Sequence, residues 1–131
     1  MEQLPPDDPR EWLNRARSNL IRAKSEIPGV YLEDLCFDAQ QAAERAIKAL
    51  LIQNKMRFPY VHDLSELLTR VMERAGQVVP EAIKQAMRLT RYAVVTRYPG
   101  LSEPVTREEY EEAVTIAESV VHWVEEIMAE R

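Results

Sequence analysis

The residues best suited to bind an anion form a basic row in the second half of the chain. Lys84, Arg88 and Arg91 are spaced by four and three residues, which places them on one face of a helix. Arg97 follows shortly after this row, and Tyr98 is next to it. Guanidinium groups bind phosphate oxygens through paired hydrogen bonds. Arg91 and Arg97 therefore predict a phosphate site. Tyr98 would stack on a base or hydrogen-bond the phosphate there. Lys84 and Arg88 also fit an ordinary charged face near a helix C-terminus.

A histidine directly before an expected helix start is the second candidate. Because histidine titrates near neutral pH, His62 fits a proton donor, a phosphate ligand or a hydrogen-bonded structural residue. Asp63 is explained by its position as the helix N-cap.

The third candidate is the polar edge of a long apolar segment. Gln41, Glu44 and Lys48 have helical spacing, and Glu44 with Lys48 forms a favourable pair of about 0.2–0.5 kcal/mol. We expect this edge to be a solvated face, and we keep Glu44 and Lys48 as candidate ligand-binding residues.

The composition excludes several classes of site. The 3 glycines are too far apart for a glycine-rich phosphate loop. The 2 histidines lack the spacing of a zinc motif, so no metal site and no cofactor are expected. The single Cys36 has no partner thiol, which fits a reducing compartment. A net charge of −5 disfavours non-specific affinity for RNA, although it is compatible with a local basic groove.

The length of 131 residues fits a single domain, with a core over about 10–128. No apolar run approaches the roughly 20 residues of a membrane span. The first residues are acidic, unlike a signal peptide. We therefore expect a cytoplasmic protein without membrane contact.

Apolar residues with helical spacing and strong start and stop signals predict helices only. Capping-box spacings at Asp8, Asp63 and Thr106 predict three helix starts. The expected helices cover about 9–27, 30–54, 63–75, a segment from Pro80 to before Pro99, and 106–127. Short connections between them predict an all-α, up-and-down antiparallel four-helix bundle with a short additional helix. Two apolar stripes on the 30–54 helix predict a homodimer, because a small bundle leaves part of one stripe uncovered.

Three segments together resemble the HEPN family over roughly residues 10–128. They are the run CFDAQQAAERAIKALL at 36–51, the element VHDL at 61–64, and TRYP at 96–99 before an acidic last helix. The resemblance implies a four-to-five-helix bundle that commonly dimerises. It also implies either a nucleotide-binding domain or an RNA-cutting toxin, often encoded beside a minimal nucleotidyltransferase.

The ribonuclease branch of that family carries an arginine followed a few residues later by a histidine. Arg91 is followed by no histidine up to Gly100, and Arg57 is too close to His62. We therefore expect a non-catalytic module that binds a nucleotide or other phosphate ligand, with a nucleotidyltransferase partner in a toxin–antitoxin-like pair. The alternatives are a metal-independent ribonuclease toxin using Arg97 and His62, and a purely structural dimerisation module.

Overall fold

A computed structural model describes residues 2–56, 63–93, 99–100 and 102–130. Its helices are α1 (Pro9–Ala23), α2 (Leu32–Gln53), α3 (Leu64–Arg74), α4 (Glu81–Lys84), the 3₁₀-helix η1 (Gln85–Ala93) and α5 (Arg107–Ala129). Within these ranges no residue is in a strand, so the predicted all-α fold is confirmed.

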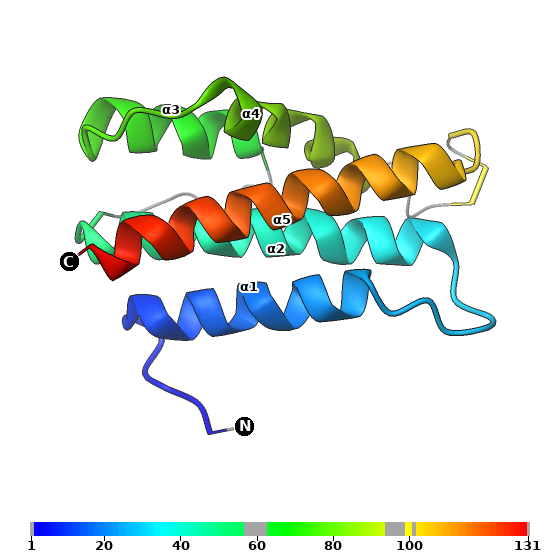
Figure 1. The fold of residues 1–131 in the computed structure, drawn as a ribbon, viewed down its shortest axis with the longest axis horizontal. Helices are drawn as coiled ribbons and strands as arrows, with labels where there is room; N and C mark the ends of the chain where they lie inside the picture. The colour runs from blue at the N-terminus through cyan, green and yellow to red at the C-terminus, as the bar shows by residue number, and fades with distance from the viewer. Residues whose placement is uncertain (1, 57–62, 94–98, 101, 131) are drawn as a thin grey trace.

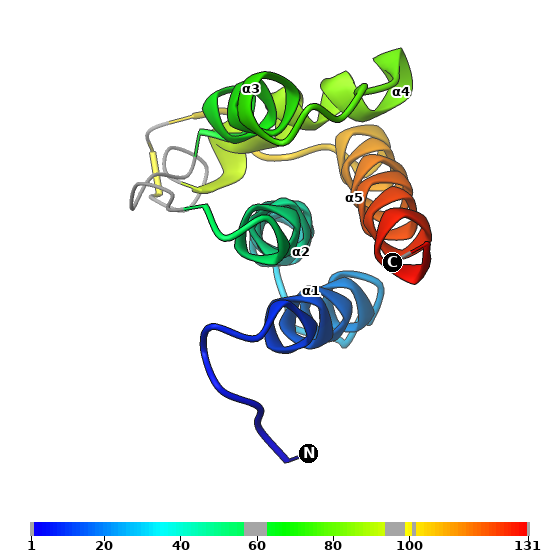
Figure 2. The same ribbon diagram turned by 90° about the vertical axis from the view of Figure 1, so that its left-hand side faces the viewer.

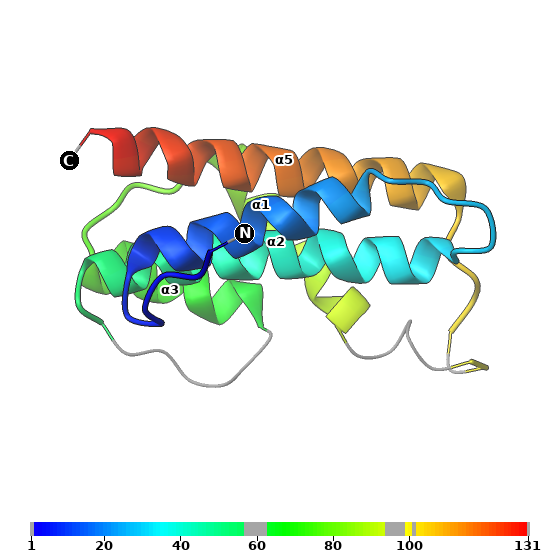
Figure 3. The same cartoon turned by 90° about the horizontal axis from the view of Figure 1, so that it is seen from below.

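The long helix α2 lies at the centre of the bundle. Figure 1 shows α1, α2 and α5 stacked side by side, with α1 and α2 running in opposite directions. Viewed end-on, α2 lies between α1 and α3, and α5 flanks it (Figure 2). From below, α1 crosses in front of α2 (Figure 3). The alanines of α2 are fully buried, which lets these neighbours pack closely: Ala39, Ala42, Ala43, Ala46 and Ala49.

Helix α1 ends at Ala23, one turn earlier than the sequence predicts. Two side chains hydrogen-bond to carbonyl oxygens that would accept backbone N–H groups if the helix continued for another turn. The Tyr110 hydroxyl donates to the Ala23 carbonyl oxygen at 2.7 Å, and Ser25 Oγ donates to the Ile21 carbonyl oxygen at 2.7 Å. Tertiary contact with α5 therefore sets this boundary.

The helix predicted from Pro80 is α-helical only over Glu81–Lys84 and continues as η1. In a 3₁₀-helix, residues three apart lie above one another. Arg88 and Arg91 therefore share one face of η1, as predicted, although the helix type was not predicted.

The predicted helix starts are confirmed, but of the three predicted capping boxes only the one at α5 is formed among the described residues: α1 and α3 have the N-cap bond alone. Thr106 and Glu109 form a complete capping box at α5. Asp63 caps α3 by accepting from the Ser65 N–H. At α1 the Asp8 side chain accepts from Arg10 N–H, whereas the Glu11 carboxylate accepts from Leu4 N–H. Glu11 therefore ties down the chain before the helix instead of closing a capping box.

Candidate functional site

The predicted basic row borders a groove of about 390 Å³ between η1 and α5. We call it the η1–α5 groove; it is lined by Arg88, Leu89, Arg91, Tyr92, Thr106, Glu108, Glu109, Glu112 and Ala113. The Arg91 guanidinium lies 5.1 Å from the ring centre of Tyr92, a cation–π contact that orients it at the rim.

Each cation of the row is paired with a glutamate. Arg91 Nη1 lies 3.0 Å from Glu109 Oε2, and Arg88 Nη2 lies 3.2 Å from Glu112 Oε1. Lys84 pairs with Glu81 of its own helix at 3.1 Å. Since 2 arginines and 3 glutamates line the groove, its formal charge is 2 − 3 = −1.

Glu109 lines this groove, and both of its carboxylate oxygens accept hydrogen bonds. Its Oε1 accepts from Thr106 N–H at 2.9 Å, and its Oε2 accepts from Arg91. Hydrogen bonding to the Thr106 backbone, and then to Arg91, lowers the pKa of Glu109. The N-terminus of α5 and an arginine thus stabilise one negative charge at the same point.

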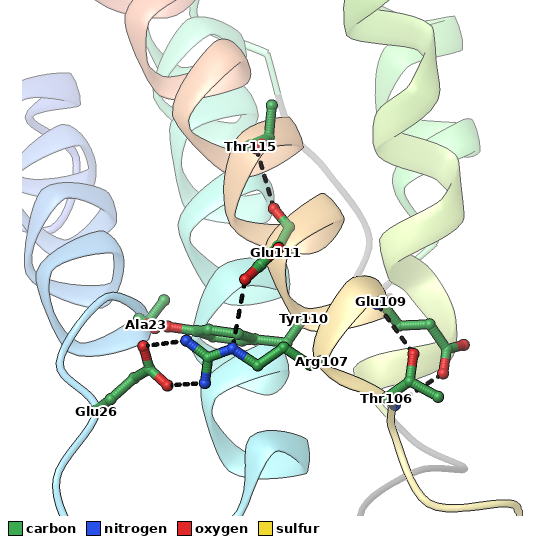
Figure 4. Close-up of polar contacts among 8 residues, drawn as sticks. All are labelled: Ala23, Glu26, Thr106, Arg107, Glu109, Tyr110, Glu111 and Thr115. Atoms are coloured by element: carbon green, nitrogen blue, oxygen red, sulfur yellow. Dashed lines mark hydrogen bonds and ion pairs between the residues drawn. The ribbon is translucent and has the colours of Figure 1, made fainter.

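The start of α5 is fixed to the end of α1 by a cluster shown in Figure 4. Both guanidinium Nη atoms of Arg107 bind the Glu26 carboxylate, and Nη2 is 2.8 Å from Oε2. The Arg107 guanidinium also stacks over the Tyr110 ring, whose hydroxyl binds Ala23. This cluster positions the α5 wall of the groove.

The polar edge of α2 is buried, so the expectation of a solvated face is wrong. Glu44 and Lys48 are 3% and 6% exposed. Lys48 Nζ donates to Glu44 Oε2 at 2.9 Å, and Gln40 Nε2 donates to Glu44 Oε1 at 2.9 Å. Trp12 of α1 lies beside the Lys48 ammonium, 6.0 Å from the ring centre. The helical spacing was predicted correctly, but it could not show that α1 covers this edge.

A second group of polar residues, which sequence reasoning missed, joins α1 to α2. Buried Asn19 donates from Nδ2 to Asp38 Oδ1 at 3.0 Å and accepts at Oδ1 from Arg45 Nη1 at 2.8 Å. Asp38 also lies 3.5 Å from Arg22 Nε. Near the start of α1, Glu11 accepts from Arg15 Nε.

Apart from Glu11, the residues in these contacts belong to two matching rows, which we call the α1–α2 polar interface together with Glu11. The rows are Trp12, Arg15, Asn19 and Arg22 on α1, and Asp38, Gln41, Arg45 and Lys48 on α2. Both have spacings of three, four and three residues, which keeps each row on one helix face. That shared spacing was the signal available in the sequence.

In the described part of the chain, all buried polar or charged residues lie on α1 or α2. They are Glu11, Asn19, Asp38, Gln40, Gln41, Glu44 and Lys48. Buried charges are costly unless they are paired, and here the partners come from both helices.

Cys36 of α2 is fully buried in the hydrophobic core. Burial, and to a lesser degree the charge of Glu33, raises the pKa of its thiol to about 12. The thiol therefore stays protonated at neutral pH and is not an activated nucleophile.

Comparison with protein families and with solved structures shows which family this fold belongs to. Residues 9–127 match the HEPN domain. The chain belongs to the HEPN family. Its fold is similar to the crystal structure of TT1696 from Thermus thermophilus, with 36% identity, a TM-score of 0.78, and coverage of 92% of this chain and 98% of that one. It is also similar to ST0689, an archaeal HEPN homologue, with 27% identity, a TM-score of 0.71, and coverage of 95% and 97%. A comparison with curated proteins gave no match.

The predicted ligand residues of this HEPN chain do not form one site in the described structure. Arg91 pairs with α5, whereas Glu44 and Lys48 lie on α2 with Trp12 of α1 beside them. His62, Arg97 and Tyr98 lie outside the described residues, so their predicted roles stay predictions.

Two further findings concern the described ranges of the HEPN chain. No cluster of three or more His, Cys, Asp or Glu side chains there could hold a metal ion. Among the helices of those same ranges, none is long and apolar enough to span a bilayer.

Proposed function

We propose that this HEPN chain is a non-catalytic binding module for a nucleotide or other phosphate ligand, acting with a nucleotidyltransferase partner in a toxin–antitoxin-like pair. The observation that carries the proposal is the position of the Glu109 carboxylate. It accepts hydrogen bonds from Arg91 and from the backbone at the start of α5. Helix N-termini and arginine forks are also the groups that bind phosphate.

In this proposal a ligand phosphate takes the place of the Glu109 side chain. The carboxylate swings out, and the phosphate accepts hydrogen bonds from Arg91 and from the α5 backbone. Tyr92 beneath Arg91 keeps the guanidinium at the groove rim. We keep Arg97, Tyr98 and His62 as further ligand residues predicted from the sequence, with Tyr98 predicted to stack on the base.

Calorimetry with ATP, GTP and UTP tests this site. Arg91→Gln should weaken binding by about tenfold or more, since it removes a charged hydrogen-bond donor. Glu109→Gln should strengthen binding, because it removes the competing negative charge. Arg17→Gln is the matched control, because Arg17 pairs with Glu125 away from the groove. Unchanged affinity in both groove variants, or no heat with any nucleotide, contradicts the site.

The non-catalytic assignment has its own assay. Purified protein should leave structured RNA intact at high concentration and without added metal. Cleavage that is lost in Arg97→Ala and His62→Ala would instead establish the ribonuclease alternative.

The partner proposals are tested on the complex. Co-expression with the product of the adjacent gene should recover a stable complex with a nucleotidyltransferase. Sedimentation at tens of micromolar should show a homodimer of this chain alone, and a monomer would contradict that part. Recovery of only the protein itself would support a structural dimerisation module.

A further inference from the structure

Three arginines lie together on the exposed side of the α1–α2 polar interface. Arg15 and Arg22 belong to α1, and Arg45 belongs to α2. Burial, followed by the positive charge of Arg15 and with a contribution from Arg22, lowers the pKa of Arg45. Contacts in the structure link two of them: Arg22 lies against Asp38, Asp38 accepts from Asn19, and Asn19 accepts from Arg45. The guanidinium groups remain charged because arginine does not lose its proton in proteins.

The carboxylates that hold these arginines lie beneath them. The side chains of Glu11 and Asp38 are 8% and 7% exposed, whereas those of Arg15 and Arg22 are 46% and 70% exposed. An anion approaching from solvent thus meets guanidinium groups before it meets carboxylates.

One nitrogen of each guanidinium group contacts a buried polar side chain, and this contact orients the group. Arg15 uses Nε for Glu11, Arg22 uses Nε for Asp38, and Arg45 uses Nη1 for Asn19. Within the described ranges, the other guanidinium nitrogens of these three arginines donate no hydrogen bond to a protein side chain. The internal contacts fix the planes of the guanidinium groups and leave donors for an incoming oxyanion.

One end of this arginine cluster opens onto a groove of about 410 Å³ between the end of α1 and the start of α2. Arg22 and Asp38 line both the groove and the polar interface. Apolar residues such as Ile27, Val30 and Leu35 line the remainder, and the carboxylate of Asp34 offers a hydrogen-bond acceptor.

We propose that this face is a second binding site, which takes a nucleoside polyphosphate. Arg15 and Arg22 are about 10 Å apart along the helix axis at 1.5 Å per residue, a span suited to a chain of phosphates. The phosphates bind Arg22, Arg45 and Arg15, and the base lies in the apolar groove with a donor facing Asp34. This site shares no residue with the η1–α5 groove and does not depend on the function proposed for it.

The site is tested by calorimetry at low salt with ATP, GTP, sodium tripolyphosphate and a short single-stranded oligoribonucleotide. We expect a nucleoside triphosphate to bind more tightly than tripolyphosphate, because only the nucleotide fills the groove. Arg22→Gln and Arg45→Gln should each weaken binding by about tenfold or more. Arg45→Lys should also weaken it, since lysine keeps the charge but lacks the fork.

Two matched controls separate this site from general electrostatics and from the η1–α5 groove. Arg17→Gln makes the same charge change on α1 but at a residue paired with Glu125 of α5, and should bind as the parent does. If both sites bind, the parent should show two binding events, and Arg91→Gln should weaken only the event that Arg22→Gln leaves unchanged. Arg22 is highly exposed, and without it Asp38 keeps its hydrogen bond from Asn19, so Arg22→Gln should remain folded in a melting experiment even if Arg45→Gln is less stable.

Several results would overturn the proposal. The first two are that no probe binds, or that Arg17→Gln and Arg22→Gln lose the same amount of affinity. The other two are that tripolyphosphate binds as tightly as ATP, or that only the oligoribonucleotide binds. Loss of nucleotide binding in Arg91→Gln but not in Arg22→Gln would place the ligand in the η1–α5 groove and reject this second site.

Discussion

The η1–α5 groove and the α1–α2 polar interface both hold arginines, but their carboxylates lie at different depths. In the groove, Arg91 and Glu109 have similar exposed fractions of 46% and 36%, so both charges face solvent. At the interface, Glu11 and Asp38 are buried under exposed arginines. Arginine content alone therefore does not show where an anion can bind, because the depth of the partner carboxylate decides which charge is presented to solvent.

The same difference predicts which region contributes to stability. Exposed ion pairs contribute little to the free energy of unfolding because water and salt screen them. Breaking a buried pair is costly, because one charge is left without its partner in a low-dielectric environment. The following variants test this contrast.

Lys48→Ala should have the largest effect, lowering the free energy of unfolding by about 3–5 kcal/mol. It removes the partner of the buried Glu44 carboxylate, which is 2.9 Å away. Chemical denaturation measures the loss. The double variant Glu44→Gln with Lys48→Met should recover much of it, because no unpaired charge remains. If Lys84→Ala, whose partner Glu81 is exposed, were as destabilising as Lys48→Ala, the contrast would fail.

Asn19→Ala should be intermediate, at about 1–3 kcal/mol. The amide is buried and hydrogen-bonds both Asp38 and Arg45, so its loss leaves polar groups of α2 unsatisfied. Thermal and urea unfolding measure the effect. Asn14→Ala is the control on the same helix, because the Asn14 side chain accepts only a long hydrogen bond of 3.5 Å from Arg17 within the described ranges. Equal melting temperatures for the two variants would contradict the structural role of Asn19.

Arg91→Ala should cost about 0–1 kcal/mol, because its pair with Glu109 is exposed. Added salt should reduce even this difference, whereas it should barely change the effect of Lys48→Ala. Denaturation at low and high ionic strength makes the comparison. A loss of several kcal/mol in Arg91→Ala would show that the groove is a structural element rather than an open site.

The acid dependence of stability should be shared between the two regions. Hydrogen bonding to the Leu4 backbone, and then to Arg15, lowers the pKa of Glu11, and Glu109 has a lowered pKa for a similar reason. A carboxylate whose pKa is lower when folded stabilises the protein above its unfolded pKa, and this stability is lost as the pH falls through the folded pKa. Stability should therefore fall as the pH drops below about 4.5, the ordinary glutamate value.

Glu11→Gln and Glu109→Gln should each make that decline shallower, and the double variant more so. Unfolding measured from pH 6 to pH 3 gives the slope. If stability falls with pH as steeply in the double variant as in the parent protein, other carboxylates are responsible for the acid dependence.

Local features of the fold were predictable from particular residues. Asp63 and Thr106 marked their helix starts because an N-cap acts on the backbone within three residues. Gly76 follows α3 with a φ of +65°, a left-handed conformation that glycine adopts without strain. The alanine-rich run of α2 indicated a central helix, because small side chains allow close packing on several sides.

The features that were not predictable depend on contacts between distant residues. The early end of α1 needs Tyr110, which is 87 residues further along the chain. The 3₁₀ form of η1 has no signal that we can identify in its residues. Glu44 and Lys48 fitted a solvated face equally well, since an i, i+4 ion pair looks the same in sequence whether a neighbouring helix covers it or not.

The sequence by itself determined the helical class, the order of the helices, most of their ends, and the resemblance to HEPN proteins. These properties depend on local periodicity, capping and motif order, which are encoded within short segments. Only the tertiary structure decided which charges are buried and which are presented to solvent. That outcome depends on how α1 and α5 pack against their neighbours. Glutamates of α5 pair with Arg88 and Arg91 of the predicted basic row, whereas carboxylates at the α1–α2 packing are buried beneath Arg15 and Arg22.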